Sequence, residues 1–344
     1  MPGIIEKWDE QVIVEDNHSN AIETEINKNT NRIKVIDETP NAEAGKTKNR
    51  KEKFGFFKEI HWTRALAVGW YNIFGLYILF TFPYLQKWRT TMWALLMANL
   101  SIFGITAGIH RLWSHKAYKA KAPLRIVLAF SYMIPFKKWI LYHRLHHKYT
   151  DTDADPHNST RGFFFSHVGW LMAKRNPAVI EKMKTIDLSD IKADPIVSFC
   201  NKYFYYFVLV IWYITTAVPV YGWNEDWYSS FLSQYLRFVY ALNVSCCVNS
   251  FAHMFGYKPY NSTITATEHA LTSYMALGEG WHNYHHVFPF DYRTPELMFD
   301  VTAHVLHFFQ KMGWAYDMRI TKESVIIATM KRKGDGSYLN AVMS

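Results

Sequence analysis

Four apolar stretches place the strongest constraint on how this 344-residue chain can fold. A helix needs about 20 apolar residues to cross a hydrocarbon core of ~30 Å. Because lipid offers no hydrogen-bond partners, the backbone of a spanning segment must satisfy its own polar groups, as a helix does. Stretches of about this length occupy residues 65–85, 92–109, 204–222 and 231–252. The sequence therefore predicts an all-α integral membrane protein with four transmembrane helices.

Composition supports this fold class, since hydrophobic residues make up 49% of the chain and aromatic residues 17%. Aromatic side chains are enriched where a membrane meets water. The fourth stretch contains polar residues that are costly in lipid, so we expect them to face the protein interior. These residues are Gln234, Arg237, Asn243 and Asn249.

Charge predicts the orientation of the four helices. Residues 223–230 carry only acidic charges, whereas residues 110–203 contain many Lys and Arg residues. By the positive-inside rule, both termini and the 110–203 segment are expected in the cytosol. Three apolar runs are too short to span and are predicted as amphipathic or re-entrant helices of a cytosolic helical cap. They cover about 124–136, 163–172 and 264–277.

The sequence predicts one membrane domain with a tail on either side, and no further domain. Residues 1–53 are expected to form a disordered cytosolic tail, residues 54–320 the membrane domain, and residues 321–344 a flexible cytosolic tail. The first residues lack the pattern of a cleavable signal peptide. Three cysteines, two of them adjacent in an apolar run, argue against a disulfide framework. A net charge of +9 without a nucleic-acid recognition motif favours a membrane surface or an acidic protein partner.

The 16 histidines are concentrated in three groups on the predicted cytosolic side. The groups are His110 with His115, His143 with His146 and His147, and His282 with His285 and His286. Histidines at positions i, i+3 and i+4 project from one face of a helix, so the second and third groups form two similar ligand faces. His110 and His115 are five residues apart, and we expect a helix end or bend near Trp113 to aim both inward.

Eight clustered imidazoles exceed what one tetrahedral zinc ion uses, so the spacing predicts a site for two metal ions. Imidazole binds Fe, Zn, Cu or Ni, and ligand type alone leaves the metal open. Other histidines are expected to make ordinary hydrogen bonds. They are His18, His61, His157, His167, His269, His304 and His307.

The histidine motifs resemble those of the membrane acyl-CoA desaturases of the stearoyl-CoA desaturase type, and most closely the insect branch. The resemblance covers roughly residues 55–320, with long motifs such as residues 143–170 and 278–292. It implies two iron ions, O2 as co-substrate, and electrons from cytochrome b5 and its NADH-dependent reductase. It also implies an endoplasmic reticulum membrane protein that introduces a cis double bond, at Δ9 or Δ11, into fatty acyl-CoA.

The resemblance also implies individual roles for residues. It adds His253 as a ninth iron ligand and places Asn249 near the metal through a water molecule. The implied ligands are His110, His115, His143, His146, His147, His253, His282, His285 and His286. Substrate contacts are implied for Lys174, Arg175, Trp139 and Trp170.

The chain departs from the family at the residues that should hold the CoA head group. The family usually reads Trp-x-Arg-Asp-His where this chain has Trp139, Ile140, Leu141, Tyr142 and His143. Further polar or aromatic positions of the family fall at Arg64, Met133, Ile134 and Cys246. Losing charged contacts should weaken the binding of CoA, or favour a different acyl carrier in its place.

Three other functions are compatible with the residues. A related di-iron lipid hydroxylase or acetylenase shares the histidine groups and differs in its product. A membrane zinc hydrolase would use fewer histidines and one zinc ion. A lipid-binding pseudo-desaturase would have no need to retain nine ligands.

Overall fold

The computed structural model describes residues 59–131, 135–294 and 300–338. The predicted tail at residues 1–53 lies outside these residues, as do Met133 and Ile134. All the elements below belong to one unit that begins at Glu59. It is mainly helical, which confirms the predicted all-α class.

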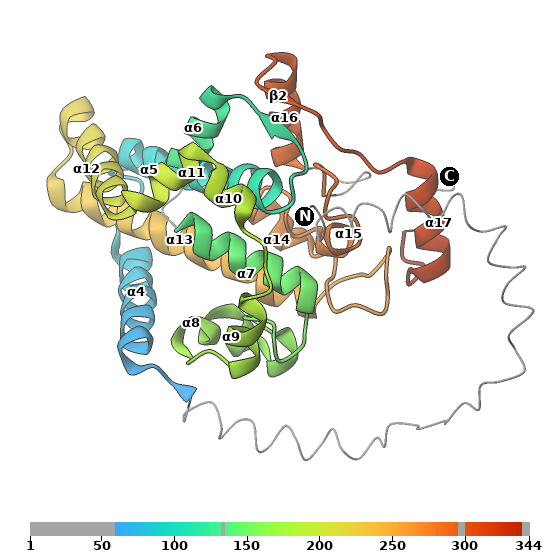
Figure 1. Cartoon of the computed structure of the whole chain (residues 1–344). Coiled ribbons are helices and arrows are strands. Elements are labelled where there is room, and N and C mark those ends of the chain that lie inside the picture. The colour runs from blue at the N-terminus through green and yellow to red at the C-terminus, as the bar shows by residue number, and fades with distance from the viewer. Residues whose placement is uncertain (1–58, 132–134, 295–299, 339–344) are drawn as a thin grey trace, which may run out of the picture. The chain divides into compact units, whose positions relative to one another are not determined.

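Four long helices coincide with the four apolar stretches (Figure 1). They are α4 (Trp62–Thr81), α5 (Trp88–Phe103) continuing into the π-helix η1 (Gly104–Ser114), α12 (Phe204–Trp223) and α13 (Trp227–Met254). Helix α13 packs against α4, α5 and α12. Gly75 permits the close approach of α4, because a Cβ atom there would lie 2.7 Å from the Val239 side chain.

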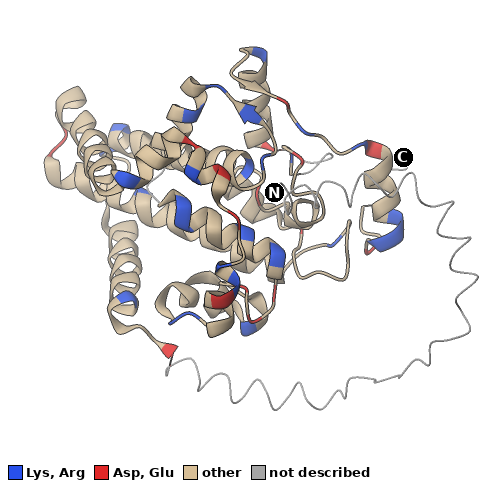
Figure 2. Cartoon of the chain, in the orientation of Figure 1, with Lys and Arg blue, Asp and Glu red and all other residues tan. Residues whose placement is uncertain are grey.

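Two of these helices are long and apolar enough to cross a membrane, among those in the described residues. They are Trp88–Ser114 and Phe204–Trp223. Large apolar side chains are nevertheless exposed along α4 as well as α12, including Leu66, Ile73, Phe80, Tyr205 and Leu209. Figure 2 shows few charged residues on either helix. Apolar surfaces of this extent mark contact with lipid or another protein rather than with water.

Helix α13 is less apolar because polar side chains line its inner face. Gln234 and Arg237 are buried, with 0% and 5% of their surfaces exposed. Arg237 donates to the Ser101 hydroxyl at 3.0 Å, and Asn243 donates to the Asn72 side chain at 2.9 Å. The expectation that the polar residues of this stretch face the interior is confirmed for Gln234 and Arg237.

Ion pairs join the α4–α5 connection to the α12–α13 connection. Both connections lie at the end of the Trp88–Ser114 helix that is opposite to His110. Helix α12 ends at Asn224, which adopts a left-handed conformation with φ of 61°. Asp226 caps α13 by accepting a hydrogen bond from the Ser229 amide at 2.7 Å. Lys87, just before α5, lies 2.6 Å from Glu225 and 2.7 Å from Asp226. The two connections therefore lie on the same side of the helix bundle.

Short helices make up much of the rest of the described chain. In chain order they are α6 (Ala122–Phe130), α7 (Phe136–Tyr149), η2 (Ser159–Arg161), η3 (Phe165–Gly169), α8 (Trp170–Met172), α9 (Pro177–Met183), α10 (Ser189–Ala193), α11 (Pro195–Lys202), α14 (Ala270–Met275), α15 (His282–Val287) and α16 (Val301–Lys311). Two short antiparallel strands, β1 (Lys119–Ala120) and β2 (Ala315–Tyr316), join α16 to the start of α6.

The C-terminal segment differs from the expected flexible tail where the structure describes it. Residues Glu323–Lys333 form helix α17. Its Ile326 and Met330 are 2% and 1% exposed, and they pack with Tyr260, Tyr284 and Phe288. The basic sequence Lys331 to Lys333 led to the prediction of a tail, but the apolar residues before it bury one face of a helix.

Candidate metal centre

A π-helix places the first two histidines together. In η1 the backbone hydrogen bond runs from the His115 amide to the His110 carbonyl, five residues back, at 3.1 Å. The wider turn puts residues i and i+5 on one face, which an α-helix does not. The ring centres of His110 and His115 lie 4.8 Å apart. The helix also ends at Ser114, next to Trp113, which agrees with the prediction of a helix end or bend there, and the wide turn is what aligns the two rings.

Helix α7 presents His143, His146 and His147 on one face, as predicted. Arg144 lies on another face and donates to the Trp113 carbonyl at 2.8 Å, at the end of η1. It also forms a two-point contact with Asp190, at 2.9 and 2.7 Å. Arg144 therefore connects α7, which carries the second histidine group, to the end of η1, which carries the first histidine group.

Helix α15 separates its histidines from the residues that anchor it. Asn283 is fully buried and accepts hydrogen bonds from the Tyr260 and Asn261 amides at 2.8 and 3.0 Å. Tyr284 donates its hydroxyl to Asp291 at 2.7 Å. These contacts anchor the face of α15 that carries Asn283 and Tyr284. On the opposite face, His282, His285 and His286 point toward the other histidines.

All nine implied ligands converge in the structure, in two groups whose potential ligand atoms lie within 4.8 Å of one another. His253, near the end of α13, joins the second group. The first group contains His110, His115, His143, His147 and His285, and the second contains His146, His253, His282 and His286. Two adjacent sets of imidazoles fit the prediction of a site for two metal ions.

The Nε2 atoms of the histidines point toward one another. His110 and His285 approach at 3.0 Å, His147 and His285 at 3.0 Å, and His146 and His286 at 3.2 Å. Nε2 of His253 is buried without a hydrogen-bond partner among the described residues. Burial, with repulsion among the imidazoles, lowers the pKa of His285 and His286 well below its usual range. Neutral imidazoles with converging lone pairs are the form that binds metal ions.

The outer nitrogens of three histidines are held by oxygen atoms. Nδ1 of His110 lies 2.8 Å from Glu279, and Nδ1 of His146 lies 2.9 Å from Asp155. Nδ1 of His253 lies 3.0 Å from the Thr265 hydroxyl. Such partners fix the orientation and tautomer of a ligating histidine, leaving Nε2 for the metal. The donor set of this site therefore fits bound metal ions.

Sequence reasoning missed the acidic partners and the arginine behind them. Burial raises the pKa of Glu279, but Arg111 and His110 outweigh it and hold that pKa below its usual value. Arg111 donates to Glu279 at 2.9 Å and to Asp300 at 2.8 Å. Glu279 lies three residues before His282, and Arg111 directly follows His110. The sequence signal that could have identified these partners was an acidic residue and an arginine close to the histidine groups.

Most of the other described histidines make ordinary hydrogen bonds, as expected. His167 contacts Ser250 at 2.9 Å, and His269 caps α14 by accepting a hydrogen bond from the Thr272 amide at 3.3 Å. His157 differs from that expectation. It is buried, its ring centre lies 4.3 Å from that of His146, and it forms a third potential metal-binding group with His146 and Asp155.

An apolar cavity of about 290 Å³ opens beside the histidines. We call it the acyl cavity. His110, His143, His146 and His282 line it together with apolar side chains of α5, η1 and α13. Asn249 and Cys246 also line this cavity.

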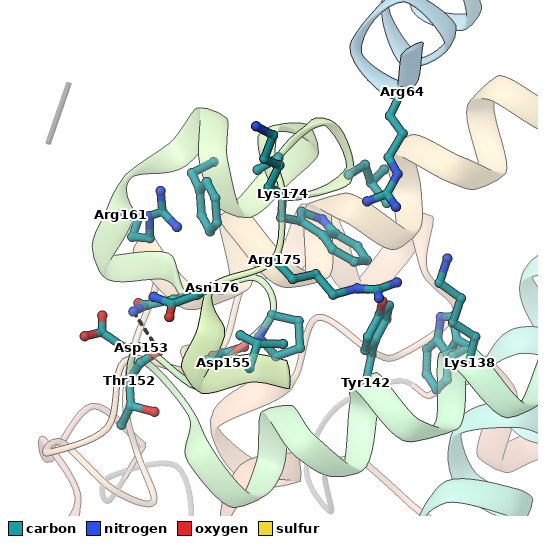
Figure 3. Close-up of a pocket in the computed structure, with 18 of the residues that line it drawn as sticks. Arg64, Lys138, Tyr142, Thr152, Asp153, Asp155, Arg161, Lys174, Arg175 and Asn176 are labelled. Atoms are coloured by element: carbon teal, nitrogen blue, oxygen red, sulfur yellow. Dashed lines mark hydrogen bonds between the residues drawn. The ribbon is translucent and has the colours of Figure 1, made fainter. Parts of the chain in front are cut away.

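A second cavity, of about 270 Å³, carries several basic side chains, and we call it the cationic pocket (Figure 3). Its basic residues are Arg64, Lys138, Arg161, Lys174 and Arg175. Arg161 is paired with Glu59 at 2.7 Å, whereas no acid among the described residues pairs with the other four. Burial, together with Arg175 and Arg64, lowers the pKa of Lys138. A group of unpaired cations in a hollow is suited to an anionic ligand.

The residues implied as substrate contacts gather at these cavities. Lys174 and Arg175 line the cationic pocket, whereas Trp139 and Trp170 line both cavities. Of the positions that depart from the family pattern, Arg64 lines the cationic pocket and Tyr142 lines both cavities. Leu141 instead packs against the hydrophobic core.

Comparison with known proteins agrees with the geometry. Residues 86–319 match the fatty acid desaturase family. The chain is 45% identical to the acyl-CoA Delta(11) desaturase of Choristoneura rosaceana over 287 residues, which are 81% of this chain and 86% of that protein. It is 41% identical to the acyl-CoA Delta-9 desaturase of Acheta domesticus, covering 86% of this chain and 85% of that protein. It is 39% identical to the acyl-CoA Delta-12 desaturase of Tribolium castaneum, covering 85% and 84%.

Converging histidines beside an apolar cavity and similarity along most of the sequence lead to one assignment. The chain belongs to the fatty acid desaturase family.

Proposed function

We propose that this protein is a membrane acyl-CoA desaturase that introduces a cis double bond, at Δ9 or Δ11, into a saturated acyl chain. The convergence of nine buried or half-buried histidines beside an apolar cavity carries this proposal. Relatives named as acyl-CoA desaturases with different double-bond positions support the reaction and the substrate class.

The histidines would hold two iron ions, one in each group. Bound iron supplies the oxidising power by which O2 removes two hydrogens from adjacent methylenes and, with two electrons and two protons from a donor, becomes two waters. The chain's own residues position both partners. Glu279 and Asp155 orient His110 and His146, and the apolar lining of the acyl cavity excludes water from the reacting carbons.

The two cavities fit the two ends of an acyl-CoA. The acyl chain would lie in the acyl cavity, since burial of methylenes there is favourable. The phosphates of CoA would lie in the cationic pocket, where Lys174, Arg175, Arg64 and Lys138 offer positive charge. In this arrangement Lys174 and Arg175 are the head-group contacts kept from the family pattern, and Arg64 and Lys138 replace polar contacts that this chain lacks.

We further propose four membrane-spanning helices, α4, α5 with η1, α12 and α13, in the endoplasmic reticulum membrane with both termini in the cytosol. The exposed apolar side chains of α4 and the inward-facing polar residues of α13 support all four spans. The acidic connection at Glu225 and Asp226 lies at the opposite end of the Trp88–Ser114 helix from His110. Electrons would come from cytochrome b5 and its NADH-dependent reductase, as the family resemblance implies, and a net charge of +9 is compatible with an acidic carrier.

Expression in a yeast strain lacking its own desaturase tests the proposed function. We expect growth without added unsaturated fatty acid and new double bonds located by mass spectrometry. His147→Ala serves as the inactive control. Hydroxylated or acetylenic products would identify the related lipid-modifying reactions instead. Purified protein containing one zinc and no iron would contradict the proposal.

A further inference from the structure

The cationic pocket and the acyl cavity share a wall. Both are lined by Pro135, Trp139, Tyr142, Trp170 and Leu171. Any ligand with an anionic head in the cationic pocket and an acyl chain in the acyl cavity must pass between these side chains. The wall therefore contacts the part of the ligand where carrier and acyl chain join.

Tyr142 lies between the two cavities and lines both of them. It is 9% exposed, and its ring lies edge-on to that of Trp170 with centres 6.1 Å apart. The Arg175 guanidinium and the Lys138 ammonium lie 5.4 and 5.9 Å from the centre of its ring. Its hydroxyl forms a hydrogen bond with Arg175. Figure 3 shows the side chain of Tyr142 between Arg175 and Lys138, with Arg64 extending toward them from α4.

Two kinds of interaction hold this ring in place. A cation over an aromatic face is attracted to it, and the attraction is stronger where water is excluded. The edge-on contact with Trp170 is a favoured aromatic geometry. The ring is therefore a fixed barrier bordered by cations.

Trp170 adds an observation that points to a ligand in the wall. Its Nε1 atom is buried and has no hydrogen-bond partner among the described residues. A buried donor without a partner is destabilising, and a ligand acceptor that reaches it removes that cost. A carbonyl oxygen at the linkage between carrier and acyl chain is such an acceptor. The unpartnered donor lies beside Tyr142, on the path a ligand would take.

We propose that Tyr142, held by Arg175 and packed against Trp170, is a specificity-determining residue that sets how deeply the acyl chain extends past the histidines. This inference rests on the proposed function. The ring fixes where the linkage stops, and therefore which methylenes lie beside His110 and His143. Removing the ring joins the two cavities and lets the acyl chain slide by one or more carbons.

Three variants test the proposal in full-length protein: Tyr142→Ala, Tyr142→Phe and the control Tyr149→Ala. Tyr149 lies on the same helix and lines neither cavity. The readouts are iron per protein and the distribution of double-bond positions made from one saturated acyl-CoA. Apolar pockets discriminate a single methylene by about 10- to 200-fold, so Tyr142→Ala should raise the share of neighbouring positional isomers by about ten-fold. Tyr142→Phe keeps the ring and should keep the main position while raising KM.

Several results would overturn the proposal. One is an iron-loaded Tyr142→Ala enzyme with the wild-type distribution of isomers, and another is an equal change in Tyr149→Ala. If Tyr142→Ala loses iron, Tyr142→Leu replaces it, and loss of iron in both variants would show a purely structural role. Iron-loaded Ala and Leu variants without any turnover would also contradict a role limited to chain depth. A wild-type protein that makes no double bond would instead refute the proposed function.

Discussion

The carboxylate of Glu279 lies 2.8 Å from Nδ1 of His110, while its other oxygen accepts a hydrogen bond from Arg111 at 2.9 Å. Arg111 and His110 hold the pKa of Glu279 below its usual value although burial raises it, so the group stays ionised. An anion at this position orients the imidazole and balances part of the charge of a bound metal ion. Asp155 stands in the same relation to His146, at 2.9 Å.

Glu279→Gln should therefore weaken metal binding while preserving the fold. Loss of such a partner typically lowers metal affinity or activity by about 10- to 100-fold. Iron content after competition with a chelator measures the effect. Glu181→Gln is the matched control, because Glu181 is exposed on α9 and pairs with Lys182 away from the histidines. Equal iron loss in both variants would contradict the role assigned to the Glu279 charge.

Gly278→Ala should disturb the arginine network behind His110. Gly278 has φ of +120°, and a Cβ atom there would lie 2.5 Å from Asp300, the partner of Arg111. Residues other than glycine in such conformations cost about 1–3 kcal/mol. We expect a lower thermal unfolding temperature and reduced iron content in purified protein. Gly222→Ala is the control, because a Cβ atom added at Gly222 would meet no neighbouring group within 4 Å.

Met330→Ala should destabilise the protein from outside the histidine groups. Met330 is 1% exposed and packs with Tyr284, which lies between His282 and His285. Truncating a buried methionine costs roughly 2–5 kcal/mol. Thermal unfolding in detergent should occur at a lower temperature, with faster loss of iron. Met312→Ala is the control because Met312 is 46% exposed, and a similar effect there would argue against the packing role of α17.

Cys246→Phe should shorten the acyl cavity without changing the histidines. Cys246 is 2% exposed and lines the cavity, whereas the adjacent Cys247 does not. Because discrimination is about 10-fold or more per methylene, kcat/KM for the longest accepted acyl chain should fall by at least about ten-fold. Shorter chains should be affected less. Chain-length profiles of Cys246→Phe and Cys247→Phe, compared at equal iron content, measure this effect, and identical profiles would contradict it.

The sequence was sufficient to predict the long helices and the ligand faces. Apolar length predicted α12 because nearly every residue of that helix is apolar, and spacing predicted the common face of His143, His146 and His147. It was insufficient for α17, whose buried face is short and precedes a basic sequence. Contacts such as Arg111 with Asp300 join residues 189 positions apart, and no local pattern encodes them.

The number and spacing of histidines were determined by the sequence alone, but their division into two groups was decided by the tertiary structure. His146 and His147 are neighbours in the chain and belong to different groups, as do His285 and His286. Successive helical residues point about 100° apart, so α7 gives two ligands to the first group and one to the second, and α15 gives one to the first and two to the second. Which group each histidine joins depends on how α7, α15, η1 and α13 pack. The five-residue spacing of His110 and His115 predicted a helix end or bend, but only the structure shows the π-helical turn that brings the two rings together.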